Sequence, residues 1–225
     1  MKRIHILLTT AALILLGLGF IFYPYISQWW NNRRHVAVAR AYYREASQLP
    51  QEEIEQHFYR AFEHNQFLYE TNSMRFGDRA PIPEDYYDIL SVSGVMARLV
   101  IPAINVDLPI LHGTTYEAML NGVAHLEGSS FPTGGYGTHA VFTAHSGMHN
   151  VIFFSRLHEL EEGDFFYIYV LDQRLVYMVD NITIILPHQV CGLAIQPDAD
   201  LVSLITCTPI TINTHRLVVR GRRYY

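Results

Sequence analysis

The first pattern in the chain is an apolar run from Ile6 to Tyr23 that follows Lys2-Arg3. A helix of this length rises about 27 Å, close to the roughly 30 Å hydrocarbon core of a bilayer. A cleavable signal peptide is the alternative, but bulky Phe20–Pro24 closes the run and Trp29-Trp30 follows, as in an interfacial aromatic belt. We therefore predict an uncleaved membrane anchor over residues 1–33. Its orientation stays open, because Arg33-Arg34 competes with the basic pair at the other end.

The pattern over residues 34 to about 70 predicts helix. His35–Gln48 contains no Gly or Pro, and Pro50 then interrupts it. Gln51-Glu52-Glu53 begins a second helix, with acidic residues where the helix dipole favours them. One apolar stripe at four-residue spacing is expected from Ile54, Phe58 and Phe62. Residues 71–83 contain Gly and Pro and predict a loop, so residues 34–90 form a helical N-terminal region.

From Val95 onward, short apolar runs bounded by turn residues are typical of strands. We predict strands at Val95–Ile101, Val106–Leu111, His139–Ala144, Phe165–Leu171, Arg174–Ile185, Leu201–Thr206 and His215–Arg220. Asp172-Gln173 is expected to form a tight hairpin, and Val151–Leu160 is the best helix in this half. Many short strands with few helices indicate an antiparallel barrel or sandwich over residues 91–225.

Composition and charge limit the classes of protein to which this chain can belong. The 225 residues are half hydrophobic, which suffices for a membrane segment and one domain with a core. The net charge is −5 and no basic run exceeds two residues, so a nucleic-acid partner is not expected. Cys191 and Cys207 are too few to staple a small protein. They could form a disulfide, remain two buried thiols, or include one catalytic thiol.

One cysteine stands at the end of a predicted strand. Cys207 follows the apolar run Leu201–Thr206, and Arg216 begins the next strand nine residues later. If these strands pair, the thiol and the guanidinium meet at one rim, where a cation would stabilise a thiolate or an oxyanion. A buried cysteine and a solvent-facing arginine remain the alternative.

A histidine could serve as general acid beside such a thiol. His145 follows the predicted strand His139–Ala144, but the chain has twelve histidines. Periodicity alone does not separate His145 from the other candidates, which are His125, His139, His149 and His215.

The block Leu204–Pro209 followed by Asn213–Gly221 resembles the catalytic block of sortases, and is most similar to the pilin-polymerising class C group. Further segments resemble sortases in consistent order over residues 86–223, namely Ile101–Ile110, Gly122–Ser130, Gly137–Ala140 and Ala144–Gly147. The resemblance implies a mainly β fold, an eight-stranded sortase-type β-barrel with a few short helices. A transmembrane helix and a helical segment would precede this barrel.

The resemblance also implies a cysteine transpeptidase mechanism. Cys207 would attack the Thr–Gly bond of a Leu-Pro-any-Thr-Gly-like sorting signal and form a thioester. His145 would protonate the leaving amine, and Arg216 would stabilise the oxyanion. Thr206 and Thr208 would contact the substrate. No metal or cofactor is implied.

The partners that the resemblance implies are surface or pilin proteins carrying sorting signals, and an amine acceptor. The acceptor would be a pilin lysine in pilus assembly. The enzyme would be a single-pass protein of a Gram-positive cell membrane with an extracellular catalytic domain. Two alternatives stay open: a sortase that attaches surface proteins to a peptidoglycan precursor in the cell wall, and a non-enzymatic, membrane-anchored β-barrel binding module with a Cys191–Cys207 disulfide.

One departure from class C sortases concerns the lid. Their lids usually carry an Asp-Pro-aromatic motif, and no Asp-Pro pair occurs in this chain. Asp78, Arg79 and Pro81 stand where a lid would lie, and Tyr86–Leu90 resembles the element that follows it. We therefore expect residues 71–85 to cover the site only loosely.

Overall fold

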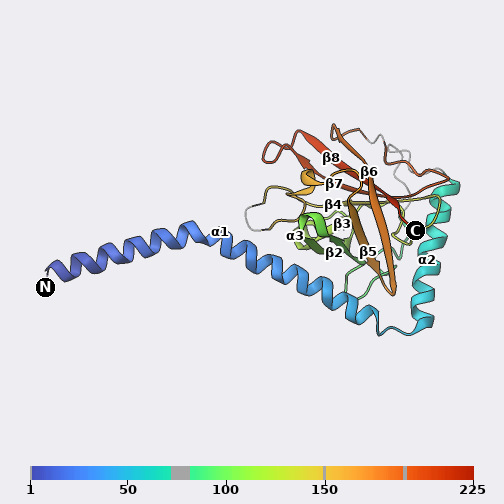
Figure 1. The fold of residues 1–225 in the computed structure, drawn as a ribbon. Helices are drawn as coiled ribbons and strands as arrows, with labels where there is room; N and C mark the ends of the chain where they lie inside the picture. The colour runs from blue at the N-terminus through green and yellow to red at the C-terminus, as the bar shows by residue number, and fades with distance from the viewer. Residues whose placement is uncertain (1, 72–81, 149–150, 190–191) are drawn as a thin grey trace.

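The computed structural model describes residues 2–71, 82–148, 151–189 and 192–225 (Figure 1). The lid prediction at Asp78, Arg79 and Pro81 lies outside these residues. So do His149 and Cys191. The described chain consists of a long N-terminal helix, a second helix and a β-barrel, which confirms the predicted order of elements.

The N-terminal helix α1 runs without interruption from Lys2 to Ala46. Its first half projects away from the barrel and its second half runs beside β2, with a bend between them (Figure 1). Pro24 lies inside α1, and a proline removes a backbone donor and commonly kinks a helix. In the described chain α1 is the one helix long and apolar enough to cross a membrane. The domain boundary predicted at residue 33 falls inside this helix.

The second half of α1 is fixed to the barrel by a buried tyrosine. The Tyr42 hydroxyl donates a hydrogen bond to the Met96 carbonyl and accepts one from the Leu171 amide, each 2.8 Å long. The two partners lie before β1 and after β5, the strands at which the barrel closes. One side chain therefore joins the helix to two strands.

Helix α2 spans Gln51–Glu70, as predicted, and Pro50 precedes it. The predicted apolar stripe is partly wrong, because Phe62 is 60% exposed. The buried face instead consists of Ile54, Ala61, Asn65 and Leu68. Asn65 exchanges two hydrogen bonds with the Phe131 backbone, at 3.0 and 2.7 Å, and so attaches α2 to the barrel.

Eight strands close the barrel in the order β1-β2-β3-β4-β7-β8-β6-β5. They are β1 (Ala97–Ile101), β2 (Val106–His112), β3 (Val123–His125), β4 (Thr138–Thr143), β5 (Phe165–Val170), β6 (Gln173–Ile185), β7 (Asp200–Thr208) and β8 (His215–Arg223). The pairs β2–β3 and β4–β7 are parallel, so the expectation of a wholly antiparallel barrel is wrong. Parallel neighbours need a crossover connection, which the short helix α3 (Tyr116–Asn121) supplies between β2 and β3.

Two local predictions are corrected by the structure. Val151–Leu160 is not an α-helix but a series of turns ending in the 3₁₀ helix η2 (Leu157–Glu159). Its backbone is engaged elsewhere, because the Phe154 amide donates to the His145 carbonyl at 3.1 Å. The hairpin turn lies one residue earlier than predicted, since Val170 already pairs with Gln173.

We predict that Tyr42→Phe lowers the free energy of unfolding by about 1–3 kcal/mol, because it leaves a buried carbonyl and a buried amide without a partner. Urea unfolding of the full chain in detergent measures the change. Tyr43→Phe is the matched control, since Tyr43 is 42% exposed and keeps its ring contact with Tyr169. Equal losses in both variants would contradict the role given to the Tyr42 hydroxyl.

Candidate active site

Two adjacent strands, β7 and β8, and the segment directly after β4 carry the residues that the sequence singled out. β7 lies between β4 and β8. In the antiparallel pair, Cys207 is directly opposite Arg216, as the predicted pairing required. In the parallel pair, Thr143 is the partner of Ile205. Two residues further along this register, His145 is level with Cys207.

The pairing continues past the end of β4, because the Ala144 amide donates to the Ile205 carbonyl at 3.2 Å. His145, Cys207 and Arg216 therefore form one row across three neighbouring chain segments. Adjacent strands lie about 4.8 Å apart, so the thiol is flanked by the imidazole on one side and the guanidinium on the other.

The three side chains also share one face of the sheet. Successive residues of a strand point to opposite faces. Ala144, Leu204 and Leu217 belong to the main core inside the barrel. Cys207 and Arg216 lie at positions of the opposite parity, and both are partly exposed. His145 follows buried Ala144 and is also partly exposed, so the row lies on the outer face.

Hydrogen bonds fix the segment around His145 against β7. The Thr206 hydroxyl donates to the Ala144 carbonyl at 2.8 Å, and the Ser146 hydroxyl donates to the Cys207 carbonyl at 2.7 Å. The first bond joins the residue before Cys207 to the residue before His145. The second joins the residue after His145 to Cys207 itself. Residues 144–146 are therefore held in register with β7 although they lie beyond β4.

Arg216 has a charge that no carboxylate neutralises at ion-pair distance, among the residues that the structure describes. Its Nη1 donates to the carbonyls of Asn213 and His215, at 3.2 and 3.0 Å. A guanidinium has five N–H donors. These bonds orient the group and leave other donors for an oxyanion or a substrate carbonyl.

Residues 99–224 match the sortase domain family model, and the match covers more than half of the chain. The chain belongs to the sortase family. Sortases are membrane-associated cysteine transpeptidases.

Solved structures similar to this sortase include class C enzymes. Sortase C1 of Streptococcus agalactiae is 35% identical with a TM-score of 0.76, covering 84% of this chain and 96% of that one. Sortase C of Streptococcus pneumoniae is also 35% identical, with a TM-score of 0.73 and coverage of 84% and 97%. Sortase C-1 of Actinomyces oris is 39% identical, with a TM-score of 0.70 and coverage of 77% and 99%. Sortase A of Bacillus anthracis is 27% identical over 158 residues, which are 68% of this chain and 73% of that protein.

The other candidate histidines that the structure describes, His125, His139 and His215, have different environments. His125 and His139 are fully buried. Burial lowers the pKa of His125 to about 3 and that of His139 to about 4, so both are neutral at physiological pH. His139 contacts the Ala194 carbonyl and the Ser203 hydroxyl, and His215 contacts the Thr214 hydroxyl. His145 is thus the described histidine in register with the thiol.

The remaining predicted site residues are placed as follows. Cys207 is a free cysteine, and Cys191 lies outside the described residues. Thr206 is buried with its hydroxyl already bonded to Ala144, so a substrate contact by Thr206 stays a prediction and would use its backbone. Thr208 is partly exposed and pairs with His215. Among described residues, no group of three or more potential ligands could hold a metal ion.

Sequence analysis missed the role of Ser146. Its hydroxyl is one of the bonds that hold the His145 segment, and the residue stands directly after that histidine. A small hydroxyl residue at this place was the available signal. Its partner is a backbone carbonyl 61 residues away, which no local pattern can show.

We predict that His139 makes the free energy of unfolding decrease as the pH is lowered. The native pKa of about 4 lies below the ordinary value of 6.5, so between these values the unfolded chain binds one more proton. This histidine should cost about 1.4 kcal/mol of unfolding free energy per pH unit as pH falls through that window. Urea unfolding of the parent and of His139→Gln at pH 7, 6, 5 and 4.5 should show a shallower slope in the variant. Parallel slopes would contradict a neutral, buried His139.

Proposed function

We propose that this sortase cleaves a Leu-Pro-any-Thr-Gly-like sorting signal through a thioester on Cys207 and transfers the acyl group to an amine. The observation that carries the proposal is the row of His145, Cys207 and Arg216 on adjacent segments. A nucleophile flanked by a proton carrier and a fixed cation meets the needs of acyl transfer.

In the first step the Cys207 thiolate attacks the threonine carbonyl carbon of the signal. The carbonyl π electrons move to oxygen, and the guanidinium of Arg216 stabilises this oxyanion. When the oxyanion collapses, the C–N bond breaks and protonated His145 gives its proton to the departing glycine nitrogen. In the second step an incoming amine attacks the thioester, His145 accepts the amine proton, and the thiolate leaves.

The order of the row sets the direction of the substrate. Cys207 is central, His145 lies on the β4 side and Arg216 on the β8 side. The leaving nitrogen must therefore face β4 while the carbonyl oxygen faces β8. The imidazole and the guanidinium are separated by two strand spacings, about 10 Å, so the two groups can act on opposite sides of the reacting carbonyl at the same time.

We further propose that the amine is a pilin lysine. The similarity to class C sortases over 77–84% of the chain at 35–39% identity supports this acceptor. The more distant likeness to a sortase A, at 27% identity, keeps attachment to a peptidoglycan amine as the second candidate.

The exposed apolar half of α1 supports a single-pass membrane anchor with an extracellular catalytic domain. None of its apolar window is buried by the rest of the chain, so water would contact it in the absence of lipid. In a sortase, acyl acceptors on the cell surface require the barrel to face outward.

We predict that the parent enzyme forms a covalent adduct with a sorting-signal peptide and that Cys207→Ala forms none. Cys191→Ala is the matched control and should retain the adduct. Mass spectrometry measures the acyl-enzyme, and offering a lysine peptide beside a peptide with an N-terminal glycine identifies the acceptor. An adduct on Cys207→Ala would contradict the assignment of the nucleophile, and preference for the glycine amine would favour the second candidate.

We predict that Arg216→Lys lowers kcat/KM about 10- to 100-fold although it keeps the charge, because an ammonium cannot reproduce the oriented guanidinium donors. Arg222→Lys is the matched control on the same strand, since Arg222 is exposed and lies six residues away. Steady-state cleavage of the peptide measures both. Unchanged turnover in Arg216→Lys would leave Arg216 only a general electrostatic role.

A further inference from the structure

The membrane-proximal part of α1 lies against the segment that follows His145. A hollow between them is lined on the helix side by Pro24, Tyr25 and Gln28. On the barrel side it is lined by Met148 and Ile152, among others. The helix therefore meets the barrel directly after its apolar run ends at Tyr23.

The height of this contact follows from bilayer dimensions. If Ile6–Tyr23 crosses the hydrocarbon core, the headgroup layer outside it is about 5–8 Å thick. Pro24 to Gln28 covers about 7 Å of helix. These residues, and with them Met148 and Ile152 across the hollow, lie at headgroup level.

The loop between β7 and β8 shares this level. A Cβ on Gly147 would stand 2.5 Å from the Cγ2 atom of Ile210, so this loop touches the segment after His145. Ile210 and Ile212 are 40% and 66% exposed, and both lie between Cys207 and Arg216 in the sequence.

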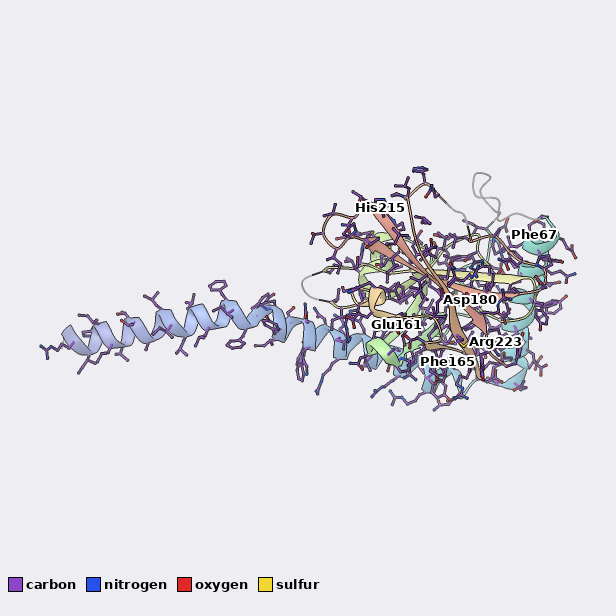
Figure 2. All side chains as sticks on the ribbon, turned by 45° about the horizontal axis from the view of Figure 1, so that its top comes forward. Phe67, Glu161, Phe165, Asp180, His215 and Arg223 are labelled. Atoms are coloured by element: carbon purple, nitrogen blue, oxygen red, sulfur yellow. The ribbon has the colours of Figure 1, made fainter. Side chains whose placement is uncertain are left out.

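Both views agree on the direction in which this end of the barrel points. In Figure 1 the β7–β8 loop projects to the side toward which the first half of α1 extends. In Figure 2, His215 at the start of β8 lies on that side, whereas Arg223 at its end lies away from it.

We propose that the end of the barrel carrying Cys207 rests on the lipid headgroup layer, with Ile210 and Ile212 in contact with the bilayer. The occupant of this apolar patch is lipid because α1 continues from the patch into a membrane-length apolar helix. Isolated exposed isoleucines gain transfer free energy at such an interface. The inference rests on the proposed function in one respect, that α1 spans the membrane.

The test places one fluorescent label at Ile212→Cys in the full chain, with Cys191→Ser and Cys207→Ala removing the native thiols. The protein is reconstituted in phosphatidylcholine–phosphatidylglycerol vesicles that contain lipids with a nitroxide on the headgroup. Ile210→Cys is a second probe of the same loop.

Asp172→Cys is the matched control. Asp172 is exposed and directly precedes β6, which begins at Gln173. The other end of β6 is Ile185, which pairs with Arg216. Asp172 therefore lies at the opposite end of a 13-residue strand, about 40 Å from the catalytic end.

We expect quenching of the labels at positions 210 and 212 to exceed that at 172 several-fold. Equally weak quenching at all three positions, in protein that floats with the vesicles, would overturn the docking while leaving the anchor intact. Protein that does not float with the vesicles would show that α1 is no membrane anchor, and the docking would fail with it.

Discussion

β4 and β7 lie side by side and parallel although β5 and β6 separate them in the sequence. The candidate site depends on this register. A slip of one residue would turn every side chain of β7 to the other face, so that Cys207 would point into the core and Thr206 would point out. The hydrogen bond from Thr206 to Ala144 can form only in the observed register, and it therefore helps to keep the thiol outside.

A second group of interactions holds the chain that follows the predicted lid. Tyr86 is buried, and its hydroxyl contacts His125 Nδ1 at 2.8 Å and accepts a hydrogen bond from the Gly113 amide at 2.9 Å. Burial raises the pKa of Tyr86, so the hydroxyl stays protonated. Together with Asn65 on α2, this network fixes the described chain on both sides of residues 72–81.

Local patterns predicted what depends on neighbours in the sequence. The longer strands and α2 were found because apolar runs, Pro50 and acidic residues mark them. The strand β3 has three residues and α3 has six, too few for a periodic signal. Val151–Leu160 was expected to be a helix, but the Phe154 amide instead donates to the carbonyl of His145, nine residues earlier.

The candidate site likewise has one part that local sequence predicts and one part that it does not. The pairing of Cys207 with Arg216 could be predicted because a short loop joins two consecutive strands. The choice of His145 came from family resemblance and not from periodicity, since its register with Cys207 is set by a parallel pairing between distant segments.

Because α1 is continuous, it also sets the distance between the barrel and the membrane. The helix has no break between its apolar run and Tyr42, so the number of residues between them fixes both the height and the rotational phase of the barrel above the lipid. One inserted residue would raise the barrel by about 1.5 Å and turn it by about 100°. Seven inserted residues would nearly restore its facing but lift it by about 10 Å. Chain length in this stretch is therefore constrained by the height and by the facing of the barrel together, which is a constraint on spacing rather than on the identity of any residue.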